Sequence, residues 1–181
     1  GSMELEYTTA TFTNCLFYEN VGPYGGATNS WQGTVTGYNC IYADNTASLY
    51  GGGHRSSTSA VDIFYNSIFY GNNTNVFEKS GASLTLHYTI CDGASAADAS
   101  VNNEVVGDPL FTDAANDDYT LSAASPGIDA GSATYAPATD ILGASRPQGV
   151  ADDLGCYELA MATWDGSTST AWNVGSNWST N

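Results

Sequence analysis

Positive charge is the feature that this chain most clearly lacks. Its 181 residues include only 3 lysines and arginines against 19 aspartates and glutamates, for a formal net charge of −16. Nucleic acids and anionic membranes bind through basic patches, so the composition argues against both as partners. The acidity does leave room for divalent cations. Long apolar runs are also missing, which argues against a transmembrane helix and against direct insertion into a membrane.

Recognisable targeting and zinc-binding patterns are missing too. No signal peptide is visible, and Gly1-Ser2-Met3 reads as a scar of tag removal. The chain then begins in the middle of a repeat at Glu4, so we expect a piece of a longer protein. None of the four cysteines belongs to a Cys-x-x-Cys pair, which argues against a zinc site.

A short phrase of the form Asn-Cys/Ser-aliphatic-aromatic recurs in the first half of the chain. Its copies start 25, 27 and 22 residues apart, and each follows an alternating run that is typical of a strand. A fixed period of this length indicates a solenoid, in which each repeat forms one coil and packs against its neighbours. The copies occupy residues 14–20, 39–45, 66–72 and, in degraded form, 88–93.

Stacking these copies in register predicts three rows of like residues. We expect an asparagine row that faces inward and bonds from coil to coil, an aliphatic stack and an aromatic stack. Glycine clusters at 25–26, 51–53 and 81 predict tight turns. The three rows are Asn14, Asn39 and Asn66; Leu16, Ile41, Ile68 and Ile90; and Phe17, Tyr42 and Phe69, with Cys91 at the end of the last.

Cys15 and Cys40 occupy the same position of two adjacent copies. Stacked strands lie ~4.8 Å apart, a separation that a disulfide tolerates. Neighbouring strands often fail the torsion requirement of the bond, however. The pattern therefore favours two buried thiols in a stack, with a Cys15–Cys40 disulfide as the alternative.

These coils resemble the right-handed parallel β-helix repeat family of secreted bacterial proteins. The C-terminal part resembles the closing segment of such proteins, as found in large Bacteroidetes surface proteins. The resemblance implies an all-β, right-handed parallel β-helix of about four coils over residues 4–106 and a capping segment over 107–159. It rests on five elements that occur in order: Asp108–Phe111, Asp118–Leu121, Ser125–Gly131, Asp140–Arg146 and Asp153–Glu158.

Two stretches depart from this repeat. Residues 94–106 are of low complexity and are expected to form a loop. Residues 160–181 resemble the opening of a further β-rich module, so we expect a linker or the truncated start of that module there. Their tryptophans could be read as a sugar-stacking platform, but the core of a neighbouring module is the favoured interpretation.

The resemblance gives the closing segment a physical role. We expect it to cover the exposed apolar end of the last coil. Arg146 should pair with Asp140, Asp153 or Glu158. Cys156 stands where the pattern usually has alanine and is a candidate disulfide partner for Cys91. The residues expected to pack on the coil end are Leu110, Phe111, Tyr119, Leu121, Ile128, Ile141, Leu154 and Tyr157.

Catalysis has one candidate surface. Parallel β-helices often act on polysaccharides, and a uronate lyase needs a base and a cation that neutralises the developing enolate. The phase of the coils is expected to gather His54, Arg55, Glu78 and Lys79 on one outer surface. The alternative is an exposed ion-pair ladder of little energetic weight. An anionic substrate would also be repelled by the net negative charge.

Calcium has two candidate sites in acidic loops. Asp117 with Asp118, and Asp152 with Asp153, could hold Ca²⁺ through carboxylates and carbonyls. Neither pair has the spacing of a known calcium loop, so solvated loops are the favoured interpretation. We therefore count calcium only as an optional cofactor.

These observations favour a non-catalytic structural or adhesion module at the C-terminal end of a secreted or cell-surface bacterial protein. Its expected partners are glycans or the surface of a host or neighbouring cell, and the isolated piece should be a monomer. The alternative is the terminal part of a polysaccharide lyase-like enzyme. Its site would lie on the Arg55/Lys79 face or on coils upstream of this sequence.

Overall fold

The strands of the chain stack as a parallel β-solenoid of about three turns, so the predicted fold class is confirmed. The computed structural model describes residues 1–73, 77–92, 100–102, 105–160, 162–164 and 178–180. Met3 is paired with Thr28, Thr28 with His54 and His54 with Phe77, so these turns are 25, 26 and 23 residues long. This agrees with the period of the sequence repeat.

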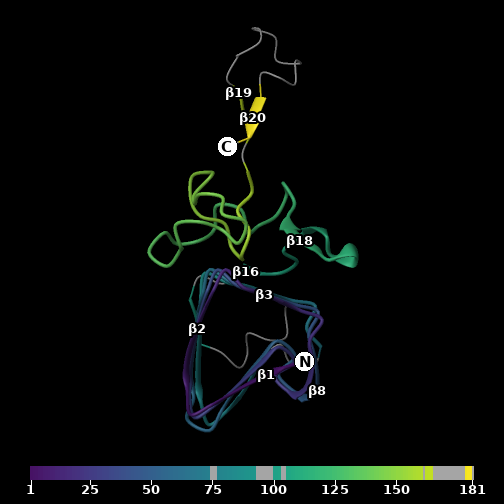
Figure 1. Ribbon diagram of the computed structural model, residues 1–181, viewed down its shortest axis with the longest axis vertical. Helices are drawn as coiled ribbons and strands as arrows, with labels where there is room; N and C mark the ends of the chain where they lie inside the picture. Colours follow the sequence, from purple (N-terminus) through teal and green to yellow (C-terminus); the bar gives the residue numbers. More distant parts are fainter. Residues whose placement is uncertain (74–76, 93–99, 103–104, 161, 165–177, 181) are drawn as a thin grey trace.

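Within the described residues, three parallel sheets and one strand pair form the sides of the coil (Figure 1). The β1 sheet contains β1 (Met3–Glu6), β5 (Thr28–Trp31), β9 (His54–Ser57) and β12 (Phe77–Ser80). The β2 sheet contains β2 (Thr9–Thr13), β6 (Thr34–Tyr38), β10 (Val61–Tyr65), β13 (Ser83–His87) and β15 (Ser100–Asn102). The β3 sheet contains β3 (Leu16–Tyr18), β7 (Ile41–Ala43), β11 (Ile68–Tyr70), β14 (Ile90–Cys91) and β16 (Val105–Val106). The short side is β4 (Val21–Tyr24) paired with β8 (Thr46–Tyr50).

The last coil continues into the segment that was expected to be a loop. β15 pairs with β13 and β16 pairs with β14, both in parallel. These two strands correct the loop prediction for residues 100–102 and 105–106. The rest of the predicted 94–106 loop, residues 94–99 and 103–104, lies outside the described residues.

Left-handed backbone conformations turn the chain at the corner between the β2 and β3 sheets. Asn14, Asn39 and Asn66 have φ angles of 51°, 49° and 49°. Asparagine visits this region more readily than most residues, which explains why the repeat places it there. At another corner the coils approach so closely that a Cβ on Gly26 would lie 2.0 Å from the carbonyl oxygen of Gly52.

Aromatic rings fill the interior of the solenoid, as the repeat predicts. Phe17, Tyr42 and Phe69 stack in register with centroid separations of 4.6 Å and 4.6 Å. Phe64 meets Tyr42 and Phe69 edge-on at 5.6 Å and 5.2 Å. Cys91 continues the row after Phe69. Stacked and edge-on pairs of this kind add to the burial of apolar surface and fix the register of the coils.

The inward direction predicted for the Asn14, Asn39 and Asn66 row is wrong. Their side-chain amides donate instead to backbone carbonyls of the C-terminal segment, at Thr139, at Asp153 and Gly155, and at Ser132 respectively. Asn66 also donates to Asn39 Oδ1 at 3.2 Å.

A different asparagine ladder runs from coil to coil. Asn45 Oδ1 accepts from the backbone N–H and the Nδ2 of Asn20 at 3.0 and 3.1 Å. Asn72 Oδ1 accepts from the same two groups of Asn45 at 3.0 and 2.8 Å. These asparagines end the repeated phrase, so the internal ladder belongs to its last position rather than to its first.

The C-terminal segment, residues 107–159, covers the side of the solenoid and not its end. Figure 1 shows it on the outer side of the sheet that carries β3. Ile41, Ile68 and Ile90 point outward from that sheet and pack with Tyr119 and other apolar residues of the segment. Its hydrogen bonds reach from the coil of Asn14 to the coil of Asn66. The predicted end-capping role is therefore corrected to that of a lateral cover.

Most residues that were expected to pack do so, but against this side surface. Tyr119, Leu121 and Leu154 are buried, whereas Leu110 and Ile141 remain 39% and 41% exposed. The segment contains an antiparallel hairpin of β17 (Phe111–Asp113) and β18 (Asp118–Leu121), joined by the short helix η2 (Ala114–Asn116).

A buried ion pair stabilises the segment. Arg146 Nη1 lies 2.6 Å from Glu158 Oε2, and both side chains are almost fully buried, which confirms one of the three predicted pairings. Arg146 also donates to the carbonyls of Asp153 and Gly155. These bonds satisfy much of the donor capacity of the guanidinium, as a buried charge requires.

The last described residues form a second hairpin. β19 (Ala162–Trp164) pairs with β20 (Trp178–Thr180) in antiparallel register. The side chains of Trp164 and Trp178, and the whole of Trp172, lie outside the described residues, so the sugar-platform interpretation stays a prediction.

Stability should increase as the solution is acidified from neutral pH. Burial raises the pKa of the Asp92 and Asp153 carboxyls above their ordinary value of 3.8. A raised pKa contributes stability that is complete below the ordinary value and is lost as pH rises through the folded-state value. We expect the free energy of unfolding, measured in urea, to rise between neutral pH and about pH 5, aided by reduced repulsion among the surplus carboxylates.

The matched variant for this pH effect is Asp153→Asn, which removes one carboxyl whose pKa is raised. Its free energy of unfolding should change less with pH than that of the parent chain. An unfolding free energy that falls steadily on mild acidification would contradict the prediction.

Candidate functional site

The outer surface of the β1 sheet carries a groove that is lined by polar and aromatic side chains. Strand alternation directs every second side chain outward, and the parallel register aligns these side chains between coils. One outward row contains Glu4, Asn29 and Arg55, and a second contains Glu6, Trp31 and Ser57. Unlike side chains therefore lie next to one another on adjacent coils.

Two tyrosines border this surface from the short side of the coil. Tyr24 on β4 and Tyr50 on β8 stack at a centroid separation of 6.3 Å with an interplanar angle of 16°. The guanidinium carbon of Arg55 lies 5.0 Å from the ring centre of Tyr24 and 5.9 Å from that of Tyr50. Such cation–π contacts stabilise by about 0.5–1 kcal/mol at exposed sites. They hold the guanidinium against the tyrosine pair.

A chain of hydrogen bonds orders the first row. Arg55 Nη1 donates to Asn29 Oδ1 at 3.4 Å, and Asn29 Nδ2 donates to Glu4 Oε2 at 2.6 Å. The Asn29 amide thus has a fixed orientation between a cation and a carboxylate. On the second row, Trp31 meets the exposed ring of Tyr7 edge-on at 5.2 Å.

An open groove with a volume of about 420 Å³ is bordered by Glu4, Tyr24, Asn29, Trp31, Tyr50 and Arg55. Glu6, Ser57 and Thr58 complete its lining. Ligand sites of this size combine aromatic surfaces with a few positioned polar groups that fix orientation. The groove offers tyrosine and tryptophan rings, two carboxylates, an amide, a guanidinium and hydroxyls.

The structure places only part of the predicted catalytic set in this groove. Arg55 is on the outer surface, but His54 points into the solenoid interior and is fully buried. His54 Nδ1 lies 2.7 Å from Thr28 Oγ1, and its Nε2 lies 3.0 Å from Asp62 Oδ2. The predicted gathering of His54 and Arg55 on one surface is wrong, because consecutive residues of a strand face opposite sides.

The other two members of that set lie on β12. Glu78 is paired with Arg55 in the parallel register, whereas Lys79 is paired with Ser56. The two cationic residues therefore occupy different rows of the sheet. The side chains of Glu78 and Lys79 lie outside the described residues.

None of the four cysteines forms a disulfide, and this includes the adjacent Cys15 and Cys40. The predicted Cys91–Cys156 pair is wrong, because Cys91 packs in the solenoid interior and Cys156 packs on the outer side of the β3 sheet. Burial raises the pKa of the Cys40 thiol and raises that of the Cys156 thiol to about 12. Both thiols are therefore protonated and unreactive at neutral pH.

Within the described residues, the carboxylates of Asp118 and Asp153 bond to nearby groups of the chain. Asp118 Oδ1 accepts hydrogen bonds from the backbone and hydroxyl of Thr120, and Asp153 accepts from the N–H groups of Asp129 and Leu159. Asp117 takes the left-handed position after η2, and Asp152 is buried. Across the part of the chain that the structure describes, no group of three or more His, Cys, Asp or Glu could hold a metal ion.

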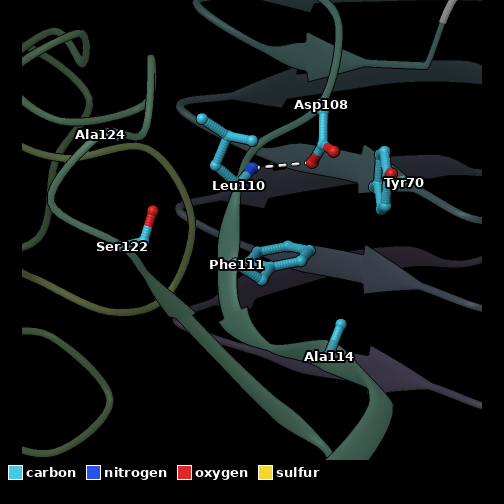
Figure 2. A pocket seen from close by; sticks show the side chains of 7 residues that line it. All are labelled: Tyr70, Asp108, Leu110, Phe111, Ala114, Ser122 and Ala124. Atoms are coloured by element: carbon cyan, nitrogen blue, oxygen red, sulfur yellow. Dashed lines mark hydrogen bonds between the residues drawn. The ribbon is translucent and has the colours of Figure 1, made fainter.

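A second cavity lies where the C-terminal segment meets the solenoid. Its volume is about 390 Å³. Figure 2 shows Tyr70 opposite Phe111 and Asp108, which line it. Asp108 Oδ1 accepts the N–H of Leu110 at 2.8 Å, so this carboxylate stabilises its own turn. Burial and the nearby Asp108 raise the pKa of the Tyr70 hydroxyl. We interpret this cavity as a gap in the packing between the C-terminal segment and the solenoid.

Comparisons with known proteins do not indicate what the groove binds, so its function is inferred from its chemistry. A scan of protein-family models, a search of curated proteins and a search of solved structures each found no match. The described residues contain no helix that is long and apolar enough to span a bilayer.

Sequence reasoning missed most of the groove. A signal was present, because Glu4 and Asn29 are 25 residues apart and Tyr24 and Tyr50 are 26 apart, close to the repeat period. Aligning the whole period would have placed each pair on neighbouring coils. Aligning the repeated phrase alone did not.

Proposed function

We propose that the chain is a non-catalytic, glycan-binding module of a secreted or cell-surface protein, with the β1-sheet groove as its binding surface. One observation carries the proposal: Trp31 and the Tyr24–Tyr50 pair border a groove that also holds Glu4, Asn29 and Arg55. The solenoid supplies a rigid support, since its coils are joined by parallel ladders and stacked side chains.

The chemistry of the groove suits a sugar. A pyranose ring presents an apolar C–H face that can lie against an aromatic ring, and a rim of hydroxyls that donate and accept hydrogen bonds. Glu4 accepts, Arg55 donates, and the Asn29 amide can do both. Tyr24 and Tyr50 are 38% and 50% exposed, so their rings remain accessible.

The negative charge of the groove and of the chain should favour some sugars over others. Glu4 and Glu6 lie in the groove, and the formal charge of the whole chain is −16. Uronate-rich polymers would be repelled by this field. We therefore expect neutral or amino sugars to bind, and anionic polysaccharides to bind poorly.

The polysaccharide lyase alternative would need a base and a cation that both reach the substrate. A base must reach the proton next to the carboxylate, and His54 is enclosed in the interior. Arg55 is held by Asn29 and the two tyrosines in the groove. Unsaturated products released from pectin, alginate or chondroitin, detected by ultraviolet absorbance, would support the lyase and contradict the binding-module proposal.

A glycan array followed by calorimetric titration tests the proposal. We expect neutral or amino glycans to bind, and Trp31→Ala or Tyr50→Ala to weaken the association constant by about tenfold or more, as for aromatic anchors at other interfaces. Tyr18→Ala is the matched control, because Tyr18 is 40% exposed but lies on the β3 sheet. It should bind within about twofold of the parent chain.

Two results would overturn the proposal. One is the absence of binding to every sugar on the array. The other is an equal loss of affinity in the groove variants and in Tyr18→Ala, which would indicate a general loss of structure. Arg55→Ala should show whether polar contacts add to stacking, because it removes the cation that anchors the tyrosine pair.

A further inference from the structure

A short stretch of the C-terminal segment arches over the corner between the β2 and β3 sheets. At one end, Asn66 Nδ2 donates to Ser132 O at 3.0 Å and Asn66 Oδ1 accepts from Ser132 N at 2.9 Å. At the other end, Asn14 Nδ2 donates to Thr139 O at 2.7 Å. Asn39, on the coil between them, bonds to Asp153 and Gly155 instead. Residues 132–139, which we call the arch, therefore cross the middle coil between two anchors.

A row of aromatic rings runs along the outer face of the β2 sheet beside the arch. Tyr38, Tyr65 and His87 are aligned in the parallel register. Their neighbouring centroids are 5.3 and 5.0 Å apart, and their planes differ by only 9° and 8°. The three rings thus form a regular aromatic strip from coil to coil.

Tyr135 of the arch shows how a ring binds to this strip. Its centroid is 3.9 Å from that of Tyr65 and 6.3 Å from that of His87. With the 5.0 Å between Tyr65 and His87, these separations make a nearly right angle at Tyr65. Tyr135 therefore lies beside the row and covers the face of Tyr65.

Next to this covered position, Tyr38 lines an open cavity of about 480 Å³, which residues of the arch also border. This volume falls in the range of small-molecule sites. The cavity is lined by Thr13, Tyr38, Thr134, Tyr135, Ala136 and Pro137, none of which carries a charge. Four of these six residues bear a hydroxyl, and three present a ring.

We propose that this cavity binds one neutral hexopyranose unit, stacked on Tyr38 next to the arch. The C–H face of the sugar would lie on the ring of Tyr38, in the way that Tyr135 lies on Tyr65. The hydroxyls of Thr13, Thr134 and the two tyrosines can donate to and accept from the sugar hydroxyls. This site lies on the β2-sheet face, so it is separate from the β1-sheet groove and does not depend on the function proposed there.

The walls favour a sugar over the other rings that could fit. A proline ring or an aromatic side chain offers a comparable apolar face but lacks a rim of hydroxyls. It would form fewer hydrogen bonds with the hydroxyls of the wall than a sugar does. A carboxylated or phosphorylated ligand would meet no cation among the six lining residues.

Saturation-transfer difference NMR with the methyl glycosides of glucose, galactose and mannose tests the site on the intact chain. We expect at least one glycoside to receive saturation and Tyr38→Ala to weaken its binding tenfold or more. Tyr38→Phe should retain most of the affinity, because it keeps the ring. Thr134→Val, on the arch, should weaken binding severalfold without altering the strip, so the test does not depend on Tyr38→Ala folding.

Cross-controls separate this site from the groove. Tyr50→Ala should leave methyl glycoside binding to the cavity unchanged, and Tyr38→Ala should leave array glycans bound at the groove. Saturation of none of the three glycosides would overturn the proposal. Binding of N-acetylprolinamide or N-acetyltyrosinamide at the same residues in place of the sugars would also overturn it.

Discussion

Replacing Asn39 with alanine should lower the free energy of unfolding by about 3–5 kcal/mol. Asn39 is fully buried and adopts a φ of 49°, where alanine is strained. Its Nδ2 donates to the carbonyls of Asp153 and Gly155 at 3.0 and 3.2 Å, and its Oδ1 accepts from Asn66 at 3.2 Å. Alanine would therefore strain the corner and remove three buried hydrogen bonds. The two carbonyls would keep only their bonds from Arg146, and Asn66 Nδ2 would keep only its bond to Ser132. Urea denaturation measures the loss.

Two variants divide this loss into its causes. Asn39→Gly removes the same hydrogen bonds but tolerates positive φ, so it should cost about 1 kcal/mol less than Asn39→Ala. Asn14→Ala changes the same position of the preceding coil, where the side-chain amide makes one bond to Thr139 O. It should therefore cost less than either variant of Asn39. Equal losses of unfolding free energy in Asn14→Ala and Asn39→Ala would contradict the view that hydrogen bonds to the C-terminal segment determine the size of the loss.

The repeated phrase was sufficient to predict the coils. The predicted alternating runs became β2, β6, β10 and β13, and the aromatic stack of Phe17, Tyr42 and Phe69 formed as expected. Period and alternation are local properties of the sequence, so they determine which residues share a row. The glycine clusters also predicted tight turns, and Gly25, Gly51 and Gly81 adopt positive φ there.

The position of the C-terminal segment could not be derived in the same way. Strand β7 contains Ile41, Tyr42 and Ala43, and all three are fully buried. Consecutive apolar residues of this kind are typical of a strand that is covered on both faces. The signal was therefore present in Leu16-Phe17, Ile41-Tyr42 and Ile68-Phe69. It does not say which part of the chain provides the cover, because that depends on contacts more than 100 residues apart, such as Asn39 with Asp153.

The candidate site was predicted only in part for a related reason. Coil phase located Arg55 on an outer surface, but a period cannot tell whether His54 or Arg55 faces inward. The answer depends on the interior polar cluster, in which His54 contacts Thr28 and Asp62. The other residues of the groove are positioned by strand pairing, which places Asn29 beside Arg55 and Trp31 beside Glu6. Neither neighbour is visible from the charged residues alone.

Replacing Asp62 with alanine should also cost about 3–5 kcal/mol, because it leaves several buried donors without an acceptor. Asp62 Oδ1 accepts from the backbone N–H of Val35 at 2.7 Å, and Oδ2 contacts His54 Nε2 at 3.0 Å and Ser56 Oγ at 2.5 Å. Asp62, His54 and Ser56 are all fully buried. Val61→Ala is the matched control on the same strand, since Val61 is 47% exposed, and it should cost well under half as much.

The pH dependence of that loss identifies its origin. Burial raises the pKa of the Asp62 carboxyl, but the bonds from His54, Ser56 and Val35 outweigh this effect and hold the pKa below the ordinary value of 3.8. A depressed pKa contributes stability that is complete above the ordinary value and is lost as pH falls through the folded-state value. The difference in unfolding free energy between the parent chain and Asp62→Ala should therefore be largest near neutral pH. It should narrow at the lowest pH where both remain folded. A difference that stays constant over this range would mean that the carboxyl acts only by filling space, and would contradict a charge-assisted network around His54.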